Sequence, residues 1–215
     1  LDNWKNPCGA PEVCEALGNS IKIGFLATVF STILGTMIAF AIGRYAFKGR
    51  STSNLLIFLP MATPEIVLGA SLLSLFLVFH INPGFWPTVI AHVMFCISFV
   101  VVTVKARIAS LDPRLEQAAM DLYANELETF RKVTLPLVAP GIAGAALLAF
   151  SLSFDDFIIT NFNSGTLKTF PEFVYTSAAR GIPAQANVIG SAMFILALLI
   201  VIAGQFVGKK AKVSK

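Results

Sequence analysis

The chain has 215 residues, of which 56% are apolar and only 13% are charged, and its formal net charge at pH 7 is +4. A soluble domain carries roughly 25% charged residues. The composition therefore excludes a soluble globular protein and indicates an all-α bundle of transmembrane helices, with no room for a separate soluble domain.

The first 18 residues are too polar to span a membrane, and the orientation argued below places them outside it. They hold Cys8 and Cys14, while Cys96 lies in a spanning stretch. Two external cysteines close in sequence favour a short disulfide, with two reduced thiols as the alternative. A metal site is not expected, because two thiolates without a nearby His are too few ligands. The chain begins at Leu1 without a signal-peptide pattern, so an outward N-terminal segment predicts one more helix upstream.

Five stretches are long and apolar enough to cross about 30 Å of hydrocarbon, namely residues 21–42, 55–79, 86–104, 141–162 and 188–207. Twelve of the sixteen Lys and Arg residues fall in 44–50, 105–132 and 209–215, which marks those segments as cytoplasmic. This bias explains the positive net charge without a nucleic-acid partner. We therefore expect one transmembrane domain over residues 1–215, made of an external segment (1–18), three spans (19–104), a cytoplasmic loop (105–140), two spans (141–208) with an external loop (163–187), and a cytoplasmic tail (209–215).

The second span contains two prolines, Pro60 and Pro64, followed by a carboxylate, Glu65. Proline removes a helix hydrogen bond and kinks the helix, and carbonyl groups freed inside a membrane must face protein or water. The span is therefore expected to line a cavity, or else to carry a purely structural kink. On a straight helix, Glu65 would lie roughly 15 Å into the membrane, near its midplane.

The cytoplasmic loop is predicted to form two short helices joined by a turn. Asp112 and Pro113 are suited to start the first helix. Asn125, with Glu128 three residues later, is similar to a capping box and predicts the start of the second helix. Pro136 is expected to end that helix. The small and polar residues of the first helix suit docking to another protein, and packing against the base of the bundle is the alternative.

Three carboxylates lie within the predicted spans: Glu65, Asp155 and Asp156. Intramembrane carboxylates are costly and mark a functional site by default. Because the spans hold no Lys or Arg apart from Lys22 at the edge of the first, the acids suit a pathway for a cation. Alternatively, Glu65 could cap the helix that restarts after Pro64. Neighbours on a helix point about 100° apart, so one aspartate could contact the pathway while the other meets a partner or caps a broken helix.

The spacing of the cytoplasmic loop resembles the signature loop of permease subunits of binding-protein-dependent ABC importers, whose pattern is Glu-Ala-Ala, three residues, Gly, nine residues, Ile, any residue, Leu-Pro. On this chain the pattern falls without a gap on Gln117, Ala118, Ala119, Tyr123, Val133, Leu135 and Pro136. Gln117 replaces Glu, and Glu116 is a candidate to supply the missing carboxylate. Tyr123 replaces Gly, and Ala124 and Asn125 are candidates to take up the bend there.

Residues 62–67, 99–104 and 153–157 are also similar to the second permease subunit of spermidine/putrescine importers, and the resemblance runs from about residue 19 to 207. It implies a MetI-like type I permease fold with six helices, five of them in this chain, in the bacterial cytoplasmic (inner) membrane. It also implies three partners: a second permease, a cytoplasmic ATPase dimer and an extracytoplasmic binding protein. The residues implied to face the ATPase are Gln117, Ala118, Ala119, Asp121, Leu122, Tyr123, Ala124 and Asn125.

The resemblance implies that polyamines pass the acids of the spans. A polyamine carries two to four ammonium groups, which carboxylates and aromatic rings can accept. The candidate aromatic neighbours of the acids are Phe154, Phe157, Tyr175 and Trp86. His92 in the third span is expected to be a hydrogen-bonded core residue.

The chain has no GxxxxGK[ST] phosphate-binding pattern, so the energy source must be another chain. We expect a transport subunit that is not an enzyme and has no cofactor of its own, with ATP and Mg²⁺ bound by the ATPase. Two alternatives are a permease for a sugar or another organic cation, and a stand-alone secondary transporter or channel in which the acids carry protons. A membrane-embedded enzyme is disfavoured, because adjacent aspartates are poorly placed for acid–base catalysis.

Overall fold

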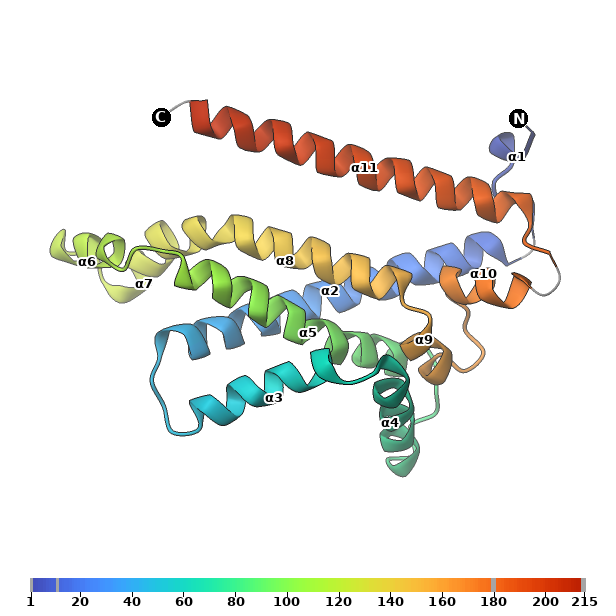
Figure 1. Ribbon diagram of the computed structural model, residues 1–215, viewed down its shortest axis with the longest axis horizontal. Helices are drawn as coiled ribbons and strands as arrows, with labels where there is room; N and C mark the ends of the chain where they lie inside the picture. The colour runs from blue at the N-terminus through green and yellow to red at the C-terminus, as the bar shows by residue number, and fades with distance from the viewer. Residues whose placement is uncertain (1, 11, 179–180, 214–215) are drawn as a thin grey trace.

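The computed structural model describes residues 2–10, 12–178 and 181–213, and these residues form helices without strands. The helices are α1 (Asp2–Lys5), α2 (Val13–Arg44), α3 (Arg50–Ala62), α4 (Glu65–Val78), α5 (Phe85–Ala109), α6 (Arg114–Asp121), α7 (Glu126–Thr129), the π-helix η1 (Phe130–Thr134), α8 (Leu135–Asp155), α9 (Ile158–Asn163), α10 (Phe170–Ala178) and α11 (Ala184–Val213). Figure 1 shows α6 and α7 at the same end as the C-terminus, with α9, α10 and the N-terminus at the other end.

The core of the bundle is formed by α2, α5 and α8, which pack along one another (Figure 1). Their buried contacts include Ala39, Val100, Val104, Ala145 and Ala149. Gly35 of α2 allows a close approach, because a Cβ there would lie 2.7 Å from Val100 Cγ1. Membrane helices use such small residues because lipid tails are as apolar as Leu and leave packing as the main attraction between helices.

By length and composition, three helical stretches of the described residues can cross a membrane, or four if α3 and α4 count as one bent span. The three are α2, α5 and the continuous stretch Glu126–Asp155. In α11, the apolar part within the described residues is Ala184–Leu199, which is shorter than the other apolar stretches. The all-α membrane bundle is therefore confirmed, while the number of five spans stays a prediction.

The break between α3 and α4 is sharper than a proline kink in one span. The chain bends by 107° between the two helices, so the second predicted span is not one straight helix, while the depth of Glu65 in the membrane stays a prediction. Pro64 has no N–H, and it restricts Thr63 to an extended backbone with φ −80° and ψ 133°. Pro60, in contrast, stays inside α3. In Figure 1, α4 turns away from the bundle axis, and Glu65 is its first residue.

The second helix of the loop does not end at Pro136, which corrects the expectation from the sequence. It begins at Asn125, whose side chain and Glu128 form the expected capping box. It then continues through η1 into α8. In η1 the N–H of Leu135 donates to the carbonyl of Phe130, and this wider turn accommodates Pro136, which has no N–H to donate. The loop is therefore joined rigidly to the fourth long apolar stretch.

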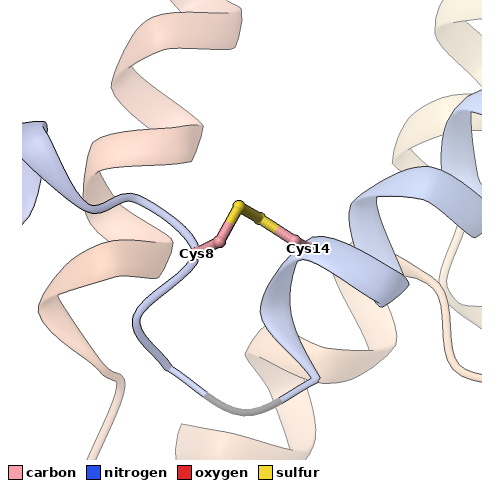
Figure 2. The surroundings of a disulfide bond; sticks show 2 residues. All are labelled: Cys8 and Cys14. Atoms are coloured by element: carbon pink, nitrogen blue, oxygen red, sulfur yellow. A yellow bond between two sulfur atoms is a disulfide. The ribbon is translucent and has the colours of Figure 1, made fainter.

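The end of the bundle that holds α9, α10 and the start of α2 is held together by contacts between segments distant in the sequence. Cys8 and Cys14 form a disulfide at the start of α2 (Figure 2). The backbone N–H of Phe170 donates to Ser20 Oγ at 2.8 Å. A buried apolar cluster joins the start of α2 to α10 and α11 through Val13, Ala16, Phe170, Phe173, Ala186 and Ile189.

The buried carboxyl group of Glu172, in α10 at this end of the bundle, gives a pH prediction. Burial raises the pKa of Glu172, although Ser164 Oγ donates to its Oε2 at 3.4 Å. A raised pKa means that the neutral carboxyl group favours the fold: its contribution is full at low pH and is lost as the pH rises through the folded-state pKa. Glu172→Gln, which stays neutral, should therefore have a higher melting temperature than the wild type at pH 8 and the same melting temperature at pH 4, below the ordinary pKa of glutamate.

Thermal unfolding of the purified protein in detergent at the two pH values measures this difference. Glu15→Gln removes an exposed carboxylate from the same end and serves as the control. An equal shift in melting temperature for Glu172→Gln at both pH values would contradict the assignment to Glu172.

Candidate functional site

Two broken helices lie side by side in this fold. The α3–α4 break is followed by α4, the α8–α9 break is followed by α9, and α4 packs against α9 (Figure 1). Asn163 Nδ2 of α9 donates to the carbonyl of Gly69 in α4 at 3.4 Å. Gly69 is needed at this contact, because a Cβ there would lie 2.9 Å from Phe162 Cδ2. The structure thus brings together two segments that the sequence placed in separate spans.

Each break presents an exposed carboxylate. Glu65 is the first residue of α4 and Asp155 is the last residue of α8. Asp155 lies close enough to both Glu65 and Asp156 for their charges to interact. All three predicted pathway acids are therefore neighbours. Among the described residues, no group of His, Cys, Asp and Glu is arranged to hold a metal ion.

Asp156 differs from the other two acids because the protein uses its carboxylate as a cap. Its side chain is buried and accepts from the backbone N–H groups of Ile159, at 3.3 Å, and Thr160, at 2.9 Å. Thr160 Oγ1 donates to the same carboxylate at 3.1 Å. Asp156 therefore caps α9, which is one of the two roles that the sequence left open for this pair of aspartates.

The helix termini give the three acids opposite electrostatic settings. Glu65 and Asp156 stand at the N-termini of α4 and α9, where partial positive charge stabilises an anion. Asp155 stands at the C-terminus of α8, where the partial charge is negative. No Lys or Arg of the described residues forms an ion pair with Asp155. Asp155 is thus the carboxylate that gains most from a bound cation.

The four candidate aromatic residues do not form one group. The Tyr175 ring packs on the ring of Phe157, with the two centroids 4.3 Å apart. Phe157 directly follows Asp156 in the sequence. Phe154 instead stacks on Phe150, and Trp86 packs against Phe85 at the start of α5. Of these three aromatic contacts between described residues, the Tyr175–Phe157 pair is the one that joins the α8–α9 break to another helix, α10.

His92 is a hydrogen-bonded core residue, and its partners are Ser153 and Thr160. Its Nδ1 lies 2.7 Å from Ser153 Oγ and its Nε2 lies 2.9 Å from Thr160 Oγ1. The sequence alone did not indicate a role for these two hydroxyl residues. The available signal was their position on either side of the Asp155-Asp156 pair in an otherwise apolar stretch.

At the other end of the bundle, α6 and the turn after it carry the stretch predicted to face an ATPase. Glu116, the candidate to supply the carboxylate missing from the resembled pattern, is bound within the bundle: Arg44 donates to it at 2.5 Å and Thr134 Oγ1 at 2.6 Å. It ties α6 to α2 and η1. The predicted residues Gln117, Ala118, Asp121, Leu122, Tyr123 and Asn125 are exposed, and Ala119 and Ala124 are half-buried. Leu122 is 82% exposed and Tyr123 is 97% exposed.

The turn after α6 is formed at Tyr123, so Ala124 and Asn125 do not take up the bend. Tyr123 adopts the left-handed backbone conformation, with φ 63°. The N–H of Tyr123 donates to the carbonyl of Met120, and that of Ala124 donates to the carbonyl of Ala119. This is the Schellman pattern, in which glycine is the usual residue. Tyr123 thus adopts the conformation expected of the Gly in the resembled pattern.

Replacing Tyr123 by Gly should therefore stabilise the protein by about 1 kcal/mol, since a side chain in the left-handed region costs about 1–2 kcal/mol and the greater freedom of unfolded Gly offsets part of it. Thermal unfolding in detergent measures the difference. The control is Ala124→Gly, because Ala124 lacks a positive φ and should lose stability. If Tyr123→Gly lost as much stability as the control, the conclusion that the backbone of Tyr123 is strained would be wrong.

A family model described as "binding-protein-dependent transport system inner membrane component" matches residues 31–210. The spermidine/putrescine transport system permease protein PotC of Haemophilus influenzae is 36% identical over 197 residues, covering 91% of this chain and 77% of the relative. The putrescine transport system permease protein PotI of Escherichia coli K12 is 37% identical over 186 residues, covering 82% of this chain and 66% of the relative.

A solved structure also shares the fold. One chain of the MetNI methionine ABC transporter, in its inward-facing conformations, superposes with a TM-score of 0.74 at 16% identity. The superposition covers 91% of this chain and 94% of the other. At this low sequence identity, the match shows a shared arrangement of helices and nothing about function.

Proposed function

The chain belongs to the family of binding-protein-dependent transport system inner membrane components, and on that basis we propose that it is a permease subunit of an ATP-driven importer that passes polyamines. Its relatives PotC and PotI are named for transport of spermidine and putrescine. Both are transport subunits, so hydrolysis of ATP, with its Mg²⁺, is assigned to a separate ATPase. This chain supplies one half of the pathway and has no cofactor of its own.

The single observation that carries the polyamine substrate is the electrostatic setting of Asp155. Its carboxylate is exposed at the negative end of α8, close to Glu65 and Asp156, and no Lys or Arg of the described residues pairs with it. An ammonium group of a polyamine would relieve this excess of negative charge. Glu65 and Asp155 stand at two adjoining breaks, which supports contacts of both carboxylates to ammonium groups of one chain-like cation.

The partners follow from the two ends of the bundle. We assign the cytoplasmic ATPase dimer to residues 117–125, where Leu122 and Tyr123 are exposed, and the extracytoplasmic binding protein to the opposite end, near α10 (Figure 1). A second permease completes the pathway in the bacterial cytoplasmic membrane. This assignment places the N-terminal segment outside and the C-terminus in the cytoplasm, in agreement with the distribution of Lys and Arg.

Competition uptake tests the substrate assignment. The assembled importer, reconstituted in proteoliposomes with its binding protein, is given labelled spermidine with an excess of unlabelled putrescine, a neutral sugar or a monovalent amine. We expect putrescine to compete and the sugar and the monovalent amine not to. Uptake that the sugar suppresses and putrescine leaves unchanged would instead support a permease for a neutral solute.

A further inference from the structure

One side chain of the straight helix α5 contacts both halves of the broken α8–α9 segment. His92 Nδ1 lies 2.7 Å from Ser153 Oγ, on the α8 side of the break. His92 Nε2 lies 2.9 Å from Thr160 Oγ1 and 3.4 Å from Asp156 Oδ2, on the α9 side. The imidazole ring therefore bridges the point at which the backbone leaves the helical conformation.

The protons of this cluster can be assigned by following its acceptors. An ionised Asp156 can only accept, so the hydroxyl of Thr160 donates to it. The Thr160 oxygen is then free to accept from His92 Nε2–H. That leaves Nδ1 unprotonated, and it accepts from the hydroxyl of Ser153. A neutral imidazole in one tautomer thus satisfies every side chain of the cluster.

The cluster is buried, so its geometry is tightly specified. His92 is 1% exposed, and Ser153, Asp156 and Thr160 are buried as well. A buried donor or acceptor that loses its partner costs the full desolvation penalty, which is about 1–3 kcal/mol. Displacement of α9 relative to α8 would separate the ring from one of its two hydroxyl partners. The cluster therefore resists movement at the break.

We propose that His92 is a positioning residue for transport, which fixes the α8–α9 break and thereby holds the Asp155 carboxylate in place for the cationic substrate. Asp155 immediately precedes Asp156, and the same backbone that places Asp156 in the cap of α9 sets the direction of Asp155. His92 does not contact the substrate in this scheme. It acts through Ser153, Thr160 and Asp156, and the proposal rests on the proposed function of Asp155.

α5 is suited to this role because it belongs to the packed core and not to either broken helix. It packs along α2 and α8 and also contacts α9. Cys96, one turn further along α5, is equally buried, and its hydrogen bond goes to α8, where its Sγ lies 3.5 Å from the carbonyl of Ala149. Cys96→Ala is therefore a matched control: a buried substitution on the same helix that leaves the bridge across the break intact.

The test uses the assembled importer with binding protein and measures the number of spermidine molecules transported per ATP hydrolysed. His92→Phe keeps an aromatic ring but removes both nitrogens, and we expect the transport ratio to fall about tenfold. His92→Gln retains one hydrogen-bond donor and one acceptor, and we expect its transport ratio to lie within about threefold of the wild-type ratio. Cys96→Ala should keep the wild-type ratio. A defect in folding alone would lower the amount of complex and leave the ratio unchanged.

A second measurement follows the break itself. Spin labels at exposed positions 151 and 161, placed in the Cys96→Ala background, report the distance between α8 and α9. We expect a broader distance distribution in His92→Phe, or in His92→Gln if the Phe variant does not assemble. Wild-type width together with a wild-type transport ratio would overturn the positioning role. Absence of polyamine uptake by the wild-type complex would overturn the proposed function, while the distances would still test whether His92 fixes the break.

Discussion

An Asp155→Asn variant is expected to take up spermidine at least about tenfold more slowly than the wild type while it assembles in normal amounts. Loss of a charge-assisted contact to an ammonium group accounts for an effect of this size. The side chain of Asp155 is exposed at the end of α8, so the substitution should leave the fold intact. Uptake by proteoliposomes, normalised to the amount of complex recovered, measures the effect.

Asp156→Asn is the matched comparison, because it makes the same chemical change at the next residue. The structure predicts a different defect there: the cap of α9 loses an anionic acceptor of two N–H groups and the Thr160 hydroxyl. The amount of assembled complex and its melting temperature should fall, with a smaller loss of uptake per complex. Equal losses of uptake per complex in the two variants would contradict the separation of a pathway acid from a capping acid.

A Leu122→Asp variant should bind the ATPase with about a hundredfold lower affinity. A charge placed at the centre of an apolar contact removes the binding energy of an interface hot spot. Leu122 is 82% exposed in this chain, so the substitution should leave the permease folded. Co-purification of the ATPase and titration of its binding to the detergent-solubilised permease measure the change.

Leu127→Asp provides the control for this prediction. Leu127 is an exposed leucine of α7 in the same cytoplasmic loop, but it lies outside residues 117–125. We expect this variant to bind the ATPase with an affinity within about threefold of the wild type, because surface substitutions away from a hot spot change binding little. If Leu127→Asp lost the ATPase and Leu122→Asp kept it, the contact surface would lie on α7, and residues 117–125 would not be the docking stretch.

Local patterns in the sequence were sufficient to predict the membrane class and the helices of the loop. Asn125 and Glu128 are three residues apart, and the capping box they form needs no other part of the chain. The apolar length of α2 and α5 likewise decides that they can cross a membrane. These features depend on neighbouring residues, whose spacing the sequence displays directly.

The arrangement of the site could not be predicted in this way, because it depends on contacts between distant residues. From the sequence, Asp156 could either contact the pathway or cap a broken helix. The structure shows the capping role, because the helix breaks after Asp155 and α9 begins at Ile158. The partner of Glu116 is Arg44, 72 residues earlier. The prolines marked a bend near Glu65, but the angle of 107° depends on how α4 packs against α9.

The most direct test of the account is ATP-dependent uptake of spermidine by proteoliposomes of defined composition. The account predicts uptake only when this chain, the second permease, the ATPase and the binding protein are all present and the ATPase has access to ATP. Spermidine uptake by this chain alone, or uptake that persists without ATP, would contradict it.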